Sequence, residues 1–153
     1  MGFSSLTWTL PVDRDSAASA PSVERDVVRA LARCRAAGRT SVLFVEPGPA
    51  ESDLLRRARE AGARVTVLCS PGRELEARES GADFVLDPRR TDPTWYRGAW
   101  SVVVDPERRF GFRRARPSIT RGGAYVTASP STGDRLLALA SRLGRGPRLA
   151  AAR

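Results

Sequence analysis

Histidine, lysine, asparagine and glutamine are all absent from this sequence of 153 residues. Without histidine the chain has no imidazole base, no Ser-His-Asp triad and no histidine ligand for a metal ion. Without lysine it cannot form a Schiff base with a substrate carbonyl. Cysteine is scarce: Cys34 and Cys69 are too few for a structural zinc site and wrongly spaced for a redox pair. We therefore predict no metal site, and any catalytic acid or base must be aspartate, glutamate, cysteine or tyrosine.

Positive charge is carried by arginine alone, and 26 basic against 17 acidic residues give a net charge of +9. A basic chain can bind an anionic partner such as nucleic acid, but these arginines are spread over most segments and no recognition motif accompanies them. We favour a solvated, arginine-rich surface and predict no nucleic-acid partner. Long apolar runs are also missing, so no membrane span is expected. The first residues make a poor secretory signal, and a cytoplasmic protein is the prediction.

Residues 1–21 are predicted to form a separate N-terminal segment. Apolar and small polar side chains alternate over residues 6–10, which is typical of a short strand with one buried face. Residues 13–21 are rich in alanine and serine and are interpreted as a polar linker. Ser22 is then placed to cap a helix that ends at Gly38.

The remainder, residues 22–153, is predicted to be a single α/β domain. From Thr40 onward, valine-rich runs separate helical patterns, and several runs are continuously apolar, which indicates strands buried on both faces. These features favour a doubly wound parallel sheet of five or six strands with helices on both faces. The expected strands are residues 42–45, 65–68, 84–86, 102–104 and 125–128, with 148–152 as a sixth at the edge. The expected helices are residues 52–61, 73–80, 108–118 and 132–143, with Gly62, Gly81 and Gly122-Gly123 at helix exits.

Four stretches carry a resemblance to a known family: VLFVEPGPAESDLLRRAREAGARVTVL, SPGRELEARESGADFVLD, WSVVVD and ITRGGAYVTAS. In this order and spacing, residues 40–129 resemble the cofactor-binding, Rossmann-like domain of the medium-chain dehydrogenase/reductase superfamily. That superfamily includes quinone oxidoreductases and polyketide enoylreductases, whose members normally carry an N-terminal catalytic domain as well. Only about 40 residues precede the first predicted strand of the unit here, too few for a domain of ordinary size. The resemblance therefore implies a stand-alone cofactor domain.

The phosphate-binding turn of that family, G-x-G-x-x-G, is altered in this sequence. The matching positions are Glu46, Gly48 and Glu51, so only the middle glycine is present. A carboxylate about 4 Å from a phosphate costs on the order of a few kcal/mol, so this vestigial loop predicts that no nicotinamide cofactor is used. Both glutamates can equally be ordinary solvated loop residues. Ser70 and Arg73, after the next strand, are the groups that would hold the 2′-phosphate if NADP were bound.

Ligands of doubly wound sheets bind beyond the carboxyl ends of the strands. Glu46, Asp87 and Asp105 follow strands and are the candidate catalytic acids and bases, because neighbouring carboxylates push each other's pKa values apart. An aspartate before a proline is also an ordinary turn residue, and this is the alternative for both aspartates. The candidate ligand-pocket residues are Cys69, Ser129, Trp95 and Trp100, although tryptophans often close a core edge instead.

Three hypotheses for function follow from these residues. The leading one is a degenerate reductase-type domain without cofactor that binds a small molecule, or promotes its cyclisation or isomerisation, in a biosynthetic pathway. The second is a non-catalytic module that pairs with a separate catalytic chain. The third is an NADP-dependent reductase completed by a partner. Because a free edge strand invites pairing, a homodimer through the C-terminal strand or residues 6–10 is expected.

Overall fold

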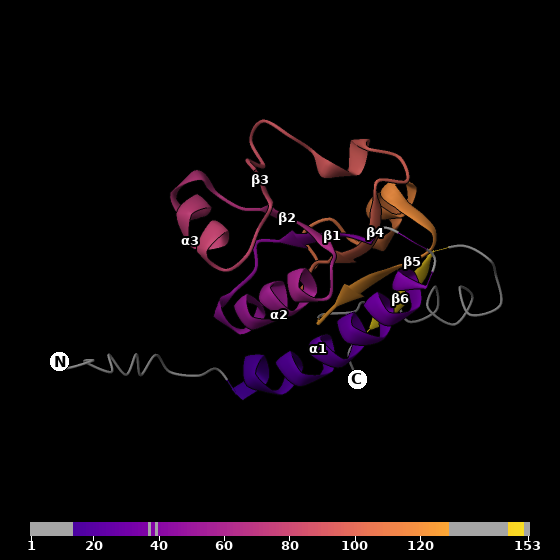
Figure 1. Cartoon of the computed structure of the whole chain (residues 1–153). Coiled ribbons are helices and arrows are strands. Elements are labelled where there is room, and N and C mark those ends of the chain that lie inside the picture. Colours follow the sequence, from indigo (N-terminus) through magenta and orange to yellow (C-terminus); the bar gives the residue numbers. More distant parts are fainter. Residues whose placement is uncertain (1–13, 37, 39, 129–146, 152–153) are drawn as a thin grey trace.

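A computed structural model describes residues 14–36, 38, 40–128 and 147–151. Its centre is a six-stranded sheet in the order β3-β2-β1-β4-β5-β6, in which every neighbouring pair is parallel (Figure 1). The strands are β1 Ser41–Val45, β2 Arg64–Leu68, β3 Phe84–Leu86, β4 Trp100–Val104, β5 Ile119–Thr127 and β6 Arg148–Ala151. The predicted parallel α/β fold and its sixth edge strand are thus confirmed.

Helix α1 precedes the first strand, and the other α-helices lie in the connections between successive parallel strands. The α-helices are α1 Arg14–Arg35, α2 Pro49–Glu60, α3 Glu74–Glu79 and α4 Phe112–Ala115, and the short 3₁₀ turns are η1 Pro71–Arg73, η2 Pro93–Trp95 and η3 Arg116–Ser118. Figure 1 shows α1 and α2 on one side of the sheet and α4 on the other. Helices therefore cover both faces, as the valine-rich strands predict.

Each central strand is buried on both faces because alternate side chains enter two different cores. In β1, Val42 and Phe44 join the apolar cluster under α1 and α2, while Leu43 and Val45 join the cluster on the side of α4. All four side chains are at most 2% exposed. Burial of this kind, at about 25 cal/mol per Å² of apolar surface, is the main stabilising contribution to the sheet. The sheet is therefore a rigid base for the turns at its carboxyl edge.

The N-terminal part of the domain differs from the prediction. Helix α1 begins at Arg14, so the proposed linker over residues 13–21 is helical from its second residue, and Ser22 lies within a helix and not at its cap. The alanines of this stretch have the highest helix propensity of any residue, and a reading that treats Pro21 as a boundary underestimates them. The predicted strand at residues 6–10 and the predicted helix at 132–143 lie outside the described residues.

Strand β5 is longer than predicted, and its two glycines have a different role. Gly122 and Gly123 lie inside the strand and not at a helix exit. Gly122 has a φ of +78°, and a side chain at Gly123 would come within 2.5 Å of the Ser101 carbonyl oxygen. The pairing with β4 shifts register between Trp100 and Val102, so the glycines allow an irregular, closely packed stretch of strand. The long helix expected over residues 108–118 is reduced to α4 and η3.

Strand β6 forms one edge of the sheet and β3 forms the other. The homodimer expected through the C-terminal strand stays a prediction. No helix in the described part of the chain is long and apolar enough to cross a membrane.

Candidate functional site at the carboxyl ends of the strands

The turn after β1 keeps a backbone conformation that glycine favours, although its first residue is a glutamate. Glu46 has a φ of +42°, which few residues with a side chain adopt. Its amide donates to the Leu68 carbonyl at the end of β2 at 2.7 Å. This bond fixes the start of the turn to the neighbouring strand. The chain therefore follows the path of a tight strand-to-helix turn, with a carboxylate added to it.

The start of α2 is closed by a second acid of the same turn. The Glu51 carboxylate accepts a hydrogen bond from the Gly48 amide at 2.8 Å, so the residue before the helix is bonded to the third residue of the helix. This is a capping-box contact, and a carboxylate here also meets the positive end of the helix dipole. The donor that would face a pyrophosphate is consequently bonded within the chain.

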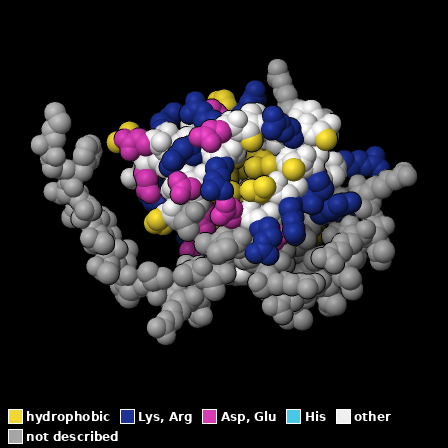
Figure 2. Space-filling model, turned by 60° about the horizontal axis from the view of Figure 1, so that its bottom comes forward, with side chains coloured by type: hydrophobic (Ala, Val, Ile, Leu, Met, Phe, Trp, Pro, Cys, Tyr) yellow, Lys and Arg dark blue, Asp and Glu magenta, His cyan; other side chains and the backbone are white. Residues whose placement is uncertain are grey.

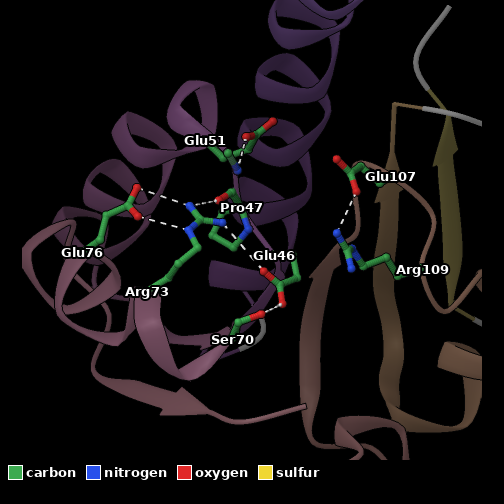
Figure 3. A network of polar contacts seen from close by, with 9 residues as sticks. Glu46, Pro47, Glu51, Ser70, Arg73, Glu76, Glu107 and Arg109 are labelled. Carbon is green, nitrogen blue, oxygen red and sulfur yellow. Dashed lines mark hydrogen bonds and ion pairs between the residues drawn. The ribbon is translucent and has the colours of Figure 1, made fainter. Parts of the chain in front are cut away.

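Arg73 binds three groups around this turn (Figure 3). Its guanidinium lies 3.7 Å from the Glu46 carboxylate, donates to the Pro47 carbonyl at 2.7 Å, and makes two hydrogen bonds to Glu76 at 3.1 and 3.2 Å. The hydrogen bond with Glu76 raises the pKa of Arg73 and lowers the pKa of Glu76. The side chain of Glu46 is only 11% exposed, so this contact lies at the base of the turn and not on its rim.

The second predicted phosphate ligand is engaged by the same carboxylate. The Ser70 hydroxyl donates to Glu46 at 3.2 Å (Figure 3). Ser70 and Arg73, the two residues that the sequence offers for a 2′-phosphate, thus both contact one acid. An incoming phosphate would have to displace Glu46 from them and then lie beside it, which like charges disfavour.

A cavity of about 570 Å³ lies next to this turn, between the carboxyl ends of β2 and β3. Two of the predicted site residues, Cys69 and Asp87, line it. Its remaining lining residues, of mixed charge, are Pro71, Glu74, Val85, Arg89 and Arg90. Cys69 is 2% exposed, and burial, followed by the charge of Glu46, raises the pKa of its thiol. Cys69 is therefore protonated at neutral pH and serves as part of the wall.

Asp87 forms the turn at the end of β3. Its carboxylate accepts from the Arg89 amide at 2.9 Å and lies 3.6 Å from the Arg89 side chain and 4.0 Å from that of Arg90. The bond to the residue two positions ahead is the local turn contact of an aspartate. The Asp87 side chain is still 23% exposed, so it is available to a molecule in the cavity.

Asp105, the third candidate, is not at this cavity. It is fully buried, and its two carboxylate oxygens accept from the Arg109 amide at 2.8 Å, the Phe110 amide at 2.9 Å and the Tyr125 hydroxyl at 2.8 Å. These bonds hold the turn after β4 against the core. The structure therefore does not bring the three carboxylates into one crevice.

The tryptophans are also separated from the cavity. Trp100 is the first residue of β4, at the amino end of the strand, and its indole donates to the Pro93 carbonyl at 3.0 Å within the core. Trp95, in η2, is 75% exposed. Neither lies with Cys69, so the predicted pocket of these residues is not formed. The sequence does not reveal this separation. The segment between β3 and β4 returns to the amino edge of the sheet before β4 begins. Ser129 lies outside the described residues.

Two residues with roles in these contacts are not among the candidates that the sequence predicts. Glu76 shares Arg73 with Glu46, and Tyr125 holds Asp105. The spacing of three residues between Arg73 and Glu76 within one helical segment was a usable signal. No sequence pattern pairs Tyr125 with Asp105. Among the described residues, no group of three or more cysteine, aspartate or glutamate side chains is arranged to hold a metal ion.

Comparison with known proteins places this geometry within a common fold. The sequence matches no protein-family profile and no curated protein. Among solved structures, the yhdH oxidoreductase from Salmonella enterica in complex with NADP superposes with a TM-score of 0.62 at 17% identity, over 88% of this chain and 44% of that chain. The quinone oxidoreductase from Coxiella burnetii gives 0.65 at 14% identity, over 88% and 42%.

A cobalt- and zinc-bound alcohol dehydrogenase from Pyrobaculum aerophilum gives a TM-score of 0.59 at 20% identity, over 90% of this chain and 41% of that chain. The chain thus spans less than half the length of these oxidoreductases. The predicted resemblance to medium-chain dehydrogenases and reductases is confirmed at the level of the fold: this chain has the architecture of one Rossmann-like domain of such enzymes.

Proposed function

We propose that this domain has lost the use of nicotinamide nucleotides and binds a small polar molecule in the cavity beside Cys69 and Asp87. The observation that carries the proposal is the 2.8 Å hydrogen bond from the Gly48 amide to the Glu51 carboxylate. A dinucleotide fold normally offers the head of this helix to pyrophosphate. Here the Glu51 carboxylate occupies the position of the pyrophosphate at the start of α2. Because it belongs to the chain, it is always present at this position.

The neighbouring contacts support the same conclusion. Arg73 and Ser70 both contact Glu46, whose side chain is largely buried. A nucleotide phosphate would need to compete with an intramolecular partner and would add its own charge next to Glu46. At about 4 Å and the effective dielectric near a protein surface, one such repulsion is on the order of 4 kcal/mol, which is about a thousandfold in affinity.

The lining of the cavity supports a polar ligand in place of the nucleotide. Glu74 and Asp87 offer acceptors, while Arg89 and Arg90 offer donors. A small molecule with both donors and acceptors, such as a hydroxylated or zwitterionic biosynthetic intermediate, is complementary to this mixture. Asp87 is the partly exposed carboxylate of the lining that sequence reasoning selected, so acid–base chemistry, such as an isomerisation, would use Asp87. A homodimer in the cytoplasm completes the proposal.

Calorimetric titration of the protein with NADPH and with NADH tests the loss of the cofactor. We expect dissociation constants of about 1 mM or weaker for both nucleotides, following the thousandfold penalty from a micromolar site. A low-micromolar constant for either one contradicts the proposal and favours a reductase completed by a partner. In that case Glu46 and Glu76 would have to release Arg73, which a crystal structure of the complex would show.

The cavity is tested separately with a thermal-shift screen of small hydroxy acids and amino acids. Ligands that stabilise the protein should lose their effect in Val85→Trp, which fills the cavity, and weaken in Asp87→Asn. Asp53→Asn, on the exposed side of α2, is the matched control for loss of an acid. Stabilisation that is unchanged in Val85→Trp would place the ligand elsewhere.

A further inference from the structure

A second hollow lies on the other side of the molecule, between the last turns of α1 and α2. Its volume is about 260 Å³, roughly the share of liquid volume of nine water molecules. Most of its lining is apolar and comes from the two helices and the residues before β1 and β2: Val28, Leu31, Ala32, Arg35, Thr40, Leu54, Arg57, Ala61 and Ala63. Val28 stays 47% exposed although it is a large aliphatic residue. On the face that Figure 2 brings forward, hydrophobic side chains gather among arginine side chains.

Thr40 gives this hollow a chemical preference. Thr40 is 7% exposed, and among the described residues its hydroxyl is the buried side-chain polar atom without a hydrogen-bond partner. The carbonyl of Thr40 has its own partner, since it accepts a hydrogen bond from the Arg64 amide at 2.9 Å. Buried hydroxyls nearly always have a partner, because leaving one unbonded is unfavourable. An acceptor on a molecule in the hollow would supply the missing bond once the Thr40 side chain turns toward it.

The mostly apolar lining of the hollow and the few charges at its mouth favour a neutral ligand. Arg57 is already bonded to Glu24. Arg35 has no such partner in the described part of the chain, but α1 ends at Arg35 and α2 ends at Glu60. Each helix end carries a partial negative charge, which offsets part of the charge of Arg35. A carboxylate or an ammonium group would lose its hydration on entering this mostly apolar hollow.

We propose that the hollow between α1 and α2 is a binding site for a small, neutral, mostly apolar molecule with one hydrogen-bond acceptor, such as a cyclic ketone. The apolar body packs against Val28, Leu31 and Leu54, and the carbonyl accepts a hydrogen bond from Thr40. This site lies at the amino ends of the strands, away from the cavity of Cys69 and Asp87. It does not depend on the function proposed above.

The probe is cyclohexanone, titrated into ¹⁵N-labelled full-length protein and followed by NMR. We expect saturable shifts of amides near Thr40 and Ala63. Thr40→Val keeps the shape of the side chain and removes the hydroxyl, so it should weaken cyclohexanone about fivefold to tenfold, as for one lost hydrogen bond. The same variant should bind methylcyclohexane, which has no acceptor, as well as the unchanged protein does. Its melting temperature should be equal or higher, because an unbonded buried hydroxyl is gone.

Two further variants and two charged probes serve as controls. Ala32→Phe, at an exposed position of the lining, should abolish binding of both probes, whereas Arg33→Gln, on the same helix but outside the lining, should not change it. Cyclohexylammonium and cyclohexanecarboxylate should bind at least tenfold more weakly than cyclohexanone. Equal cyclohexanone affinity in Thr40→Val, or in Ala32→Phe, would overturn the proposal. It would also be overturned if light scattering showed a dimer that Ala32→Phe converts to a monomer, because the hollow would then be a contact between two copies.

Discussion

The Tyr125 hydroxyl donates to the Asp105 carboxylate at 2.8 Å, and both side chains are completely buried. This bond joins β5 to the turn that follows β4. The hydrogen bonds that the Asp105 carboxylate accepts from the Arg109 and Phe110 amides hold the remainder of that turn. Asp105, which the sequence suggests as a possible catalytic residue, thus holds a loop in place. Substitutions at its contacts are therefore expected to lower the stability of the domain.

Tyr125→Phe should lower the free energy of unfolding by about 1–3 kcal/mol, because it leaves a buried acceptor with one bond fewer. Urea denaturation followed by circular dichroism measures the change. Tyr96→Phe is the control: Tyr96 is 52% exposed, and its hydroxyl loss should alter stability by less than about 0.5 kcal/mol. Equal effects of the two substitutions would show that the Tyr125–Asp105 bond contributes nothing.

Gly123→Ala should destabilise the domain by about 1–3 kcal/mol or more, since an added methyl group would lie 2.5 Å from the Ser101 carbonyl oxygen and 2.7 Å from the Ile119 side chain. The strands β4 and β5 would have to separate locally. Gly72→Ala serves as the comparison, because nothing lies within 4 Å of the added atom there. Thermal melts of both variants suffice, and a Gly123→Ala protein as stable as Gly72→Ala would contradict the tight approach of these strands.

Replacing both glutamates of the turn, Glu46→Gly with Glu51→Gly, should tighten NADPH binding about tenfold or more, because it removes two charges, frees the Gly48 amide and Ser70, and leaves Arg73 with Glu76 and Pro47 as its remaining partners. Calorimetry reports the dissociation constant. The double variant Glu46→Gln with Glu51→Gln removes charge but keeps side-chain bulk, so it separates the two causes. No gain in the glycine variant would mean that the nucleotide site was lost for a reason outside this turn.

The Asp92 carboxylate should make the free energy of unfolding depend on pH in the acid range. Burial tends to raise the pKa of its carboxyl, but hydrogen bonds from Thr94 and Arg114 outweigh burial and leave the pKa below its ordinary value of 3.8. The resulting stabilisation is therefore present above pH 3.8 and is lost as the pH falls through the lower folded value. Asp92→Asn should lose stability at neutral pH and converge with the unchanged protein in strong acid. Unfolding free energies measured across this range check the convergence, and Thr94→Val should fall between the two curves.

The sequence was sufficient for the sheet because its signals are repeated and local. A run such as Val102–Val104 between two turn signals has few alternatives to a buried parallel strand. The turn at Glu46 was also predictable, because each glycine of the G-x-G-x-x-G motif that it matches has a known role in the turn, in phosphate binding or in helix packing. The contacts of this turn were predictable only in part. The sequence alone does not show whether the side chains of Ser70 and Arg73 contact an acid or face solvent, because that depends on how β1 and β2 lie side by side.

Other predictions were wrong because they depend on how segments far apart in the sequence lie in the fold. The position of Trp100 relative to Cys69 depends on where the chain returns to the sheet after β3, and no local pattern encodes that path. The helical start at Arg14 differs from the prediction because Pro21 suggests a boundary, whereas the alanines before it favour a helix. Gly122 and Gly123 suggest a helix end, because glycine commonly follows a helix and weakens the interior of a strand, whereas both lie in β5.

Glu46 shows that the path of the turn and the chemistry of the turn are independent. Its positive φ persists without glycine, while its amide is held by the Leu68 carbonyl, so the neighbouring strand imposes the path. The sheet therefore sets the backbone path of this turn for different side chains. Randomising positions 46 and 51 together should then yield proteins that share one backbone and differ in the anions they accept. A change of binding specificity at this turn would then need new side chains at these two positions and no change of fold.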